Sequence, residues 1–287
     1  MIAGARHYRP LIRAVELLIE SDFNALWVVG KPGIGKSYIV DYTLKQLNAN
    51  YVLFRGDISD AYLHEFLYYN RNKLIIMRDT AKFLRRLNCI DIFKAISEKG
   101  ERRISRKTYA ERNAPDTFEF SGKIIFEMND VMQKYKEDLN ALFNRGIYLE
   151  VVLSRQQIQE IMMEIARERW QRKVTKYLIE KADILGSHFN LRTQNKAFSI
   201  YQASIKQGRN WKADLDLFFE NQLSEPRKLL YMFAGNEPVK RMDFVRFLMR
   251  EKGWSYATVQ RKINDWIILG EIKTNGLKKQ AILYIGD

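Results

Sequence analysis

Short apolar runs alternate with longer amphipathic stretches over the first half of the chain. Five of these runs have the length and residue types of buried strands, and they cover residues 26–30, 51–54, 74–77, 123–126 and 147–153. Apolar positions recur at helical spacing between them, for instance over residues 38–47 and 90–96. Strands that alternate with helices predict an α/β fold, in which a parallel sheet is the middle one of three layers.

The pattern becomes wholly helical after residue 153. Apolar residues follow helical spacing over residues 156–182 and again over residues 190–206. A Ser-Glu-Pro sequence at residues 224–226 then interrupts this stretch. We therefore expect three domains: an α/β domain over residues 1–153, an α-helical unit over 154–223 and a small domain over 224–287. A chain of 287 residues is long enough for two or three such units.

The C-terminal domain combines three predicted helices with a hairpin. Helices are expected over residues 227–233, through residues 244–248 and over residues 256–269, where Ser255 can cap the third. Two short strands flank an Asn-Gly turn at residues 275–276. Three helices followed by such a hairpin predict a winged helix, and the third helix of a winged helix enters the major groove of DNA.

Polar and basic side chains on the third helix and at the hairpin are the candidates for contact with DNA. The helix carries Tyr256, Thr258, Gln260, Arg261 and Lys262. At the hairpin, Lys278 and Lys279 can meet phosphates. A winged helix that docks onto another protein remains the alternative.

Charge adds to the picture of a nucleic-acid partner. The chain has 48 Lys or Arg against 34 Asp or Glu, a formal net charge of +14, and a strongly basic protein often meets a polyanion. Residues 225–287 hold 12 basic and 7 acidic side chains, so +5 lies there and +9 upstream. There is a single cysteine, no apolar run of 18 residues and no secretory signal, and we expect a cytoplasmic protein. The three histidines are dispersed, which argues against a zinc site.

The end of the first predicted strand carries a complete phosphate-binding motif. The pattern G-x-x-x-x-G-K-[ST] is matched at every fixed position, between a predicted strand and a predicted helix. Its residues are Gly30, Lys31, Pro32, Gly33, Ile34, Gly35, Lys36 and Ser37. Backbone N–H groups of such a loop face the phosphates, Lys36 reaches the β and γ phosphates, and the Ser37 hydroxyl coordinates Mg²⁺. The chain is therefore predicted to bind Mg-ATP.

Hydrolysis also requires polar groups at the ends of neighbouring strands. After the third strand come Arg78 and Asp79, and two registers are open. In the strict register Arg78 takes the position of the metal ligand, whereas in the shifted register Asp79 holds the metal. We favour the shifted register, because an arginine facing a divalent ion would repel it. At the end of the fourth strand Asn129 can orient the attacking water, and Glu127, on the same face of the strand, can replace a missing glutamate.

These residues together resemble the AAA+ ATPases over roughly residues 1 to 220. The loop 30–37 is similar to Walker A, Asp79 to a degenerate Walker B and Asn129 to sensor 1. The segment 138–145 looks like the helix before the fifth strand, and its Arg145 would reach the γ-phosphate on a neighbouring subunit. The segment 190–193 looks like sensor 2 at the start of a lid helix, with Arg192 facing the phosphates. The resemblance extends to ATPases of phages, plasmids and archaeal viruses.

The resemblance and the residues together favour an ATP-dependent, DNA-transacting AAA+ ATPase with ATP and Mg²⁺ as cofactors. Its expected partners are duplex DNA, further copies of itself, often six in this family, and a replicative helicase. Replication initiation or helicase loading for a virus or mobile element is the expected role. The alternatives are a nucleotide-switched DNA-binding regulator with little hydrolysis, and a DNA-packaging or transposition-helper motor.

Overall fold

The protein is described by a computed structural model, over residues 3–56, 59–79, 87–105, 114–129, 136–222, 225–235, 237–268, 272–275 and 281–284. The chain forms two compact units, Met1–Gln157 and Ile158–Asp287. Each unit is described by itself below. The division into three domains predicted from the sequence stays a prediction.

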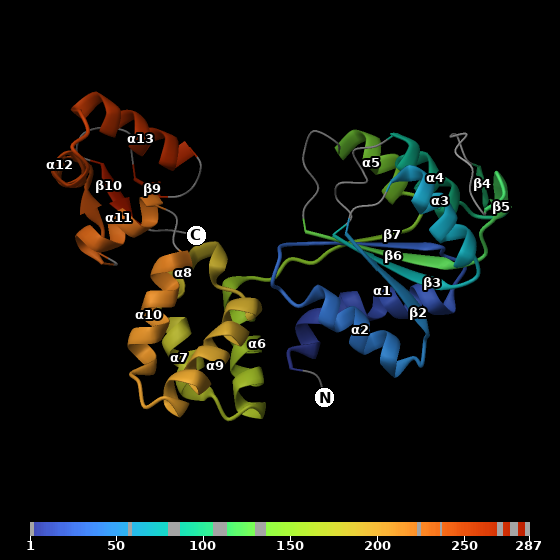
Figure 1. The fold of residues 1–287 in the computed structure, drawn as a ribbon, viewed down its shortest axis with the longest axis horizontal. Helices are drawn as coiled ribbons and strands as arrows, with labels where there is room; N and C mark the ends of the chain where they lie inside the picture. Colours follow the sequence, from blue (N-terminus) through green and yellow to red (C-terminus); the bar gives the residue numbers. More distant parts are fainter. Residues whose placement is uncertain are drawn as a thin grey trace. The chain divides into compact units, whose positions relative to one another are not determined.

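The first unit is built on a five-stranded parallel sheet in the order β2-β3-β6-β1-β7 (Figure 1). Its strands are β1 (Ala25–Val29), β2 (Tyr51–Arg55), β3 (Leu74–Arg78), β6 (Lys123–Met128) and β7 (Ile147–Glu150). The α/β fold with a parallel sheet is confirmed. The sequence pattern ended the fourth strand at residue 126, whereas β6 continues to Met128 and so includes Glu127. A separate two-stranded ladder of β4 (Arg103–Ser105) and β5 (Thr117–Glu119) was not predicted.

Helices cover both faces of this sheet. The helices η1 (Ala5–Tyr8), α1 (Arg9–Glu20) and α2 (Lys36–Gln46) lie on one side, and α3 (Asp60–Tyr69), α4 (Leu87–Ser97) and α5 (Lys136–Phe143) on the other (Figure 1). Every residue of β1 is consequently buried. This two-sided burial explains why the strand reads as a continuous apolar run rather than an alternating one.

An aromatic stack forms the centre of the core beneath α4 and α5. The rings of Trp27 on β1 and Phe126 on β6 are parallel, with their centroids 3.9 Å apart. Phe143 and Phe93 pack edge-on against this pair, at 5.5 Å from Trp27 and 4.7 Å from Phe126. The stack fixes the spacing of β1 and β6, the strands that precede the P-loop and Asn129.

The second unit begins with helices alone. They are α7 (Arg172–Glu180), α8 (Ala182–Leu185), η4 (Gly186–His188), α9 (Leu191–Lys206) and α10 (Trp211–Gln222), and α6 (Arg155–Glu168) leads into them across the boundary. The helix predicted from residue 190 is present as α9. The Asn190 side chain caps it by accepting hydrogen bonds from the backbone N–H groups of Arg192 and Thr193.

The end of the chain contains three helices and a small antiparallel sheet. The elements are α11 (Glu225–Ala234), β8 (Val239–Lys240), α12 (Arg241–Lys252), α13 (Tyr256–Ile268), β9 (Lys273–Thr274) and β10 (Ile282–Tyr284), and the strand order is β8-β10-β9. The pairing of β9 with β10 agrees with the expected hairpin. Strand β8, which adds a third strand, was not predicted. The apolar face of α13 lies in the core of this region, with Val259, Ile263 and Trp266 buried.

Across the described ranges, no helix has both the length and the apolar character needed to cross a membrane.

The packing of the first unit is tested at Trp27, with an exposed tryptophan of the second unit as the control. Trp27→Ala should lower the free energy of unfolding by about 3–5 kcal/mol, because it removes a fully buried indole from the stack. Trp170→Ala is the matched control, since that side chain is 94% exposed; it should change stability by no more than about 0.5 kcal/mol. Chemical denaturation followed by circular dichroism measures both. Equal losses would contradict the described core.

Candidate functional site

The P-loop leaves the end of β1 and leads directly into α2. Gly35 is the residue before the helix and has a left-handed backbone with φ of 89°, which glycine adopts without strain. At Gly30 a side chain has no room, since a Cβ would lie 2.5 Å from the carbonyl oxygen of Val151. The loop therefore has to pass close to the chain beyond β7, and the backbone N–H groups of the first turn of α2 lie at its end.

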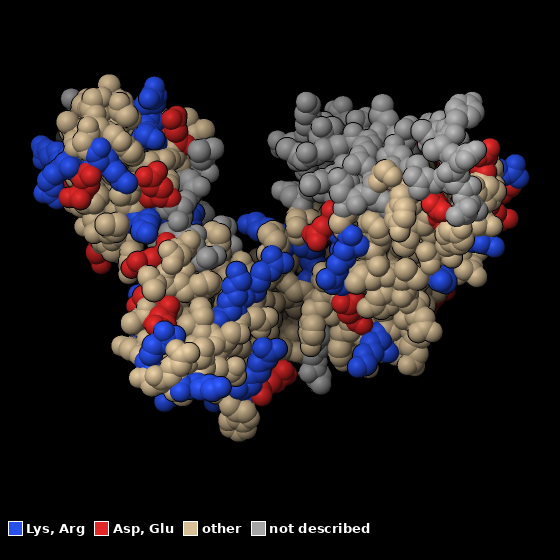
Figure 2. Space-filling view, viewed as in Figure 1, with Lys and Arg blue, Asp and Glu red and all other residues tan. Residues whose placement is uncertain are grey.

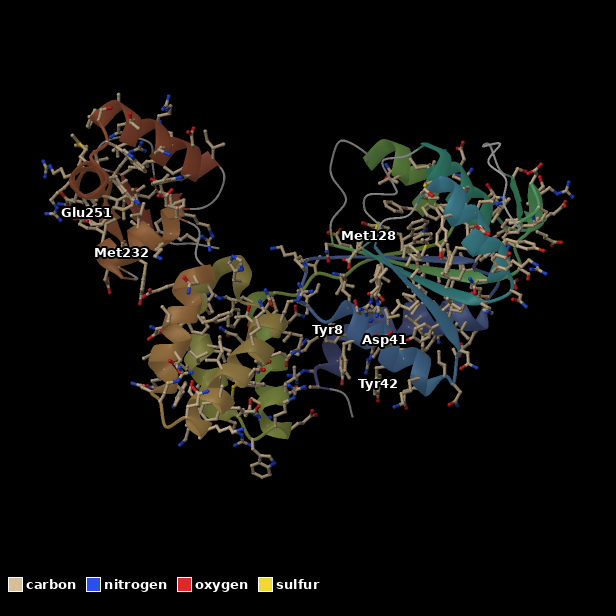
Figure 3. All side chains as sticks on the ribbon, in the orientation of Figure 1. Tyr8, Asp41, Tyr42, Met128, Met232 and Glu251 are labelled. Atoms are coloured by element: carbon tan, nitrogen blue, oxygen red, sulfur yellow. The ribbon has the colours of Figure 1, made fainter. Side chains whose placement is uncertain are left out.

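Two buried side chains hold the loop in its shape. The Lys36 ammonium donates hydrogen bonds to the carbonyl oxygens of Gly30 and Lys31, at 2.6 and 2.9 Å. The Tyr8 hydroxyl donates to the carbonyl oxygen of Ile34 at 2.6 Å, and burial raises the pKa of Tyr8. Tyr8 and Asp41 both lie on the α1 and α2 side of the sheet (Figure 3).

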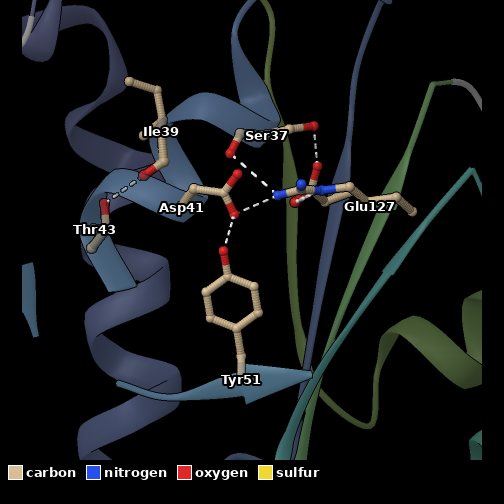
Figure 4. Close-up of polar contacts among 7 residues, drawn as sticks. Ser37, Ile39, Asp41, Thr43, Tyr51 and Glu127 are labelled. Carbon is tan, nitrogen blue, oxygen red and sulfur yellow. Dashed lines mark hydrogen bonds and ion pairs between the residues drawn. The ribbon is translucent and has the colours of Figure 1, made fainter. Parts of the chain in front are cut away.

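A polar network joins the residue after Lys36 to the sheet (Figure 4). The Ser37 hydroxyl donates a short hydrogen bond to Oε2 of Glu127. The Nε of Arg78 donates to Oε1 of the same carboxylate at 3.0 Å. The Nη2 of Arg78 donates to Asp41 at 2.6 Å and to the backbone carbonyl of Ser37 at 3.4 Å. The Tyr51 hydroxyl completes the network by donating to Asp41 at 2.9 Å.

The ionisation of the network follows from burial and pairing. Burial raises the pKa of Glu127, and the hydrogen bond from Ser37 and the charge of Arg78 oppose that effect only in part. For Arg78, burial lowers the pKa, but the contacts with Asp41 and Glu127 outweigh it and the pKa is raised. With both carboxylates ionised, one guanidinium faces two carboxylates, and the network carries one net negative charge.

This donor set fits a magnesium ion that is held mainly by phosphates and water. The Ser37 hydroxyl donates its hydrogen bond to Glu127, so its oxygen keeps lone pairs that can bind a cation. No group of three or more His, Cys, Asp or Glu side chains that could hold a metal occurs among the described residues. Magnesium in nucleotide sites commonly takes only one or two protein ligands and completes its shell with substrate phosphates.

The ends of β3 and β6 differ from the expected arrangement in one respect. The shifted register, which we favoured, placed Asp79 rather than Arg78 at the metal position. In the structure Arg78 is buried and takes part in the Ser37 network. Its charge is tolerated there because two carboxylates neutralise it. Asp79 is exposed, has φ of 60° and takes part in no side-chain hydrogen bond or ion pair among the described residues. Asn129 is likewise exposed. Roles for these two residues in metal or water binding stay predictions.

The two candidate arginines lie in different units. Arg145 follows α5, and its Nε contacts a Glu98 oxygen at 2.5 Å while its Nη1 donates to the Ala141 carbonyl at 2.6 Å. It is thus bound within its own chain, to the end of α4. Arg192 is exposed in the first turn of α9 in the second unit.

The DNA candidates on α13 are not equally available. Tyr256 and Arg261 are exposed, and Thr258 shares a hydrogen bond of 2.9 Å with the capping Ser255. The Gln260 oxygen already accepts two hydrogen bonds from Arg241, at 3.2 and 2.8 Å. Lys262 lies 4.6 Å from the centre of the Trp254 ring.

Lys278 and Lys279 lie outside the described residues. On the face drawn in Figure 2, Lys and Arg are spread over both units with acidic residues among them.

Comparison with known proteins identifies solved structures with a similar fold and a partial sequence match. No protein-family model matches the chain. A protein of Enterobacteria phage T4, described as an uncharacterized 36.7 kDa protein in the nrdC-mobD intergenic region, is 27% identical over 165 residues. That match covers 52% of this chain and 50% of the phage protein, so the chain spans about half the length of this curated relative.

Solved structures of RuvB from Thermotoga maritima share the fold. Two mutant forms superpose with a TM-score of 0.53 at 13% and 12% identity, covering 100% of this chain and 93% and 94% of RuvB. A third RuvB mutant gives a TM-score of 0.51 at 12% identity. The chain accordingly shares the fold of RuvB. At this identity the likeness establishes the fold alone.

Three members of the Ser37 network were not assigned to the site from the sequence, namely Asp41, Arg78 and Tyr51. Asp41 lies one helical turn after Ser37, a spacing that places two side chains on the same face of a helix. Arg78 and Glu127 are direct partners across the β3–β6 ladder, which no local motif reveals. Tyr51 gives no signal of its own, because it is separated from Asp41 by the turn between α2 and β2.

The contact between Arg241 and Gln260 separates a structural from a DNA-binding role on α13. Gln260→Ala should lower the free energy of unfolding by about 1–3 kcal/mol, because a buried guanidinium loses two acceptor contacts. Arg261→Ala, one position along and exposed, should alter stability by at most about 0.5 kcal/mol. Thermal unfolding of both variants provides the measurement. A Gln260→Ala protein as stable as wild type would show that this contact contributes little.

Proposed function

We propose that this chain is an ATPase that binds Mg-ATP at its P-loop and acts on DNA. The observation that carries the proposal is the closed glycine loop around buried Lys36, next to a Ser37 hydroxyl anchored by a buried carboxylate. The fold that this chain shares with Thermotoga maritima RuvB supports the proposal, because RuvB is described as a Holliday junction branch migration motor.

The residues around the loop have distinct roles in this proposal. Lys36 binds the β and γ phosphates, which would replace the loop carbonyls as its partners, and the N–H groups at the start of α2 bind further phosphate oxygens. A bound Mg²⁺ would neutralise charge that develops on the phosphates during transfer. Asp79 and Asn129 follow β3 and β6 and would serve to bind the ion or orient the attacking water.

Arg145 and Arg192 would supply further positive charge to the γ-phosphate. For Arg145 this requires release from Glu98, whose contact is partly exposed and therefore weak. A second copy of the chain would receive Arg145, which makes activity depend on assembly. The number of subunits, six in many AAA+ proteins, is part of this proposal.

DNA binding is assigned to the C-terminal region. Three helices and the β8-β10-β9 sheet support a winged helix with α13 as the recognition helix. Tyr256, Thr258 and Arg261 would read bases, while Lys262 and the hairpin lysines Lys278 and Lys279 would contact phosphates. Because Gln260 is paired with Arg241, it is the weakest candidate for a base contact.

The biological role proposed is replication initiation or helicase loading for a virus or mobile element. A nucleotide-switched DNA-binding regulator with little hydrolysis is the second candidate. Arg78 at the end of β3 favours it, because in the strict register this arginine takes the position of the metal ligand. Turnover of ATP, measured with and without duplex and single-stranded DNA alongside mass by light scattering, tests these functions. A monomer that binds ATP without turnover under every condition supports the regulator.

The role of the P-loop lysine is tested by a pair of variants in α2. Lys36→Ala should reduce affinity for ATP at least about tenfold and abolish turnover, because the phosphates lose a buried cation. Lys45→Ala removes an exposed lysine from the last turn of the same helix and should retain wild-type binding. Titration of a fluorescent ATP analogue gives both affinities. Unchanged affinity in Lys36→Ala would refute the assignment of the site.

The role of α13 is tested by two exposed arginines in the C-terminal region. Arg261→Ala should weaken binding to duplex DNA by about 1–3 kcal/mol on sequences whose base it reads. Arg246→Ala removes the same charge from α12, where the side chain is 75% exposed, and should give a small loss common to all sequences. Fluorescence anisotropy with a panel of duplexes distinguishes them. If the two variants behave alike on every duplex, α13 does not read bases.

A further inference from the structure

The carboxylate beside the P-loop serine belongs to an unexpected strand. The third strand, β3, ends in Arg78, and its direct partner across the ladder on β6 is Glu127. The Ser37 hydroxyl is hydrogen-bonded to Glu127. The acid bonded to Ser37 thus lies on β6, whereas in the AAA+ pattern described above the metal-site acid follows the third strand.

We propose that Glu127 is the residue that positions the Ser37 hydroxyl for Mg²⁺, and that Arg78 holds Glu127 in place. This inference rests on the proposed binding of Mg-ATP and adds to it the carboxylate on which the metal depends. Glu127 is thereby a positioning residue, which acts on the metal through Ser37.

The hydrogen-bond capacity of each group supports this role. A serine hydroxyl has one proton and two lone pairs. An ionised carboxylate can only accept, so the proton of Ser37 must point to Glu127 and the lone pairs are left for a cation. A metal-bound hydroxyl whose proton has a fixed acceptor is held in one orientation, as outer partners generally do for metal ligands.

Arg78 orients the carboxylate and does not compete for the serine. Its Nε contacts Oε1 at 3.0 Å, whereas Ser37 contacts Oε2, so each oxygen of Glu127 has its own partner. The same guanidinium reaches Asp41 on α2 at 2.6 Å. The two carboxylates outnumber the guanidinium, which offsets the repulsion between Arg78 and a divalent cation.

Asp79, the acid that the motif itself suggests, lacks this connection. It is exposed, and the described residues include no hydrogen bond between its side chain and Ser37. The acid that is hydrogen-bonded to the Ser37 hydroxyl is therefore Glu127.

The test is a Mg²⁺ titration of the binding of a fluorescent ATP analogue to the full chain, with a parallel measurement in EDTA. Glu127→Gln preserves shape, but one of the two carboxylate oxygens becomes an NH₂ donor. Ser37 and Arg78 contact different oxygens of Glu127, so one of them loses its acceptor. We expect the Mg²⁺ concentration for half-maximal stimulation of binding to rise about 10–100-fold. Affinity in EDTA should stay within about twofold of wild type, because Lys36 and the loop N–H groups are untouched.

Glu119→Gln is the matched control, because it makes the same change at an exposed position of β5. It should leave the Mg²⁺ dependence of binding within about twofold of wild type, since no described contact links Glu119 to Ser37. A rise in the Mg²⁺ requirement of Glu119→Gln as large as that of Glu127→Gln overturns the proposal. If Glu127→Gln does not fold, a double variant provides the test. An unchanged requirement in a folded Glu127→Gln protein, checked by circular dichroism, overturns it as well.

A double variant separates positioning from a purely structural effect. Arg78→Asp combined with Glu127→Gln returns an acid to the end of β3, next to Ser37. Partial recovery of the Mg²⁺ response supports a need for a carboxylate beside Ser37, whereas no recovery supports a structural role for Glu127 and counts against the proposal.

The wild-type measurement separates this inference from the proposed function. If wild type binds no nucleotide in either buffer, the proposed function fails. If it binds equally well in Mg²⁺ and in EDTA, nucleotide binding stands and the metal-positioning role of Glu127 fails.

Discussion

The ion pair between Arg78 and Glu127 links two neighbouring strands at the point where the P-loop meets the sheet. Both side chains are almost wholly buried, at 7% and 3% exposure. Taking such charges out of water costs on the order of several kcal/mol per ion, and close pairing with complete hydrogen bonding is needed to offset that cost. Ser37 and Asp41 supply the remaining partners. The network thus fixes α2 to the sheet one residue after the P-loop lysine.

The sheet makes this arrangement possible because β6 lies between β1 and β3. Parallel strands end at the same edge, so the P-loop after β1 lies beside the ends of both other strands. The stack of Trp27 on Phe126 holds β1 against β6 from within the core. Packing on one side and ion pairing at the edge therefore act on the same strands, and the position of Ser37 depends on both.

Phosphate binding and phosphate cleavage make different demands on this site. Binding needs the loop, Lys36 and the start of α2, all of which are held by contacts within the first unit. Cleavage also needs a group that orients water, and the candidate side chains Asp79 and Asn129 are exposed at the sheet edge. Under the proposed function, hydrolysis would depend on assembly more than nucleotide binding does, because Arg145 is bound to Glu98 of its own chain and would have to be released.

The sequence by itself determined the features that depend on neighbouring residues. The five strands, the P-loop, the helix that begins near residue 190 and the third helix of the C-terminal region all follow from local spacing and were predicted. The ends of β6, the strands β4, β5 and β8, and the pairing of Gln260 with Arg241 were not. Each of these is decided by contacts between segments far apart in the chain. The environment of Arg78 is the clearest case. The positive charge of this residue argued against a position beside Ser37. The strand register places Glu127 opposite Arg78, Asp41 lies within hydrogen-bond distance, and these two carboxylates make the position favourable.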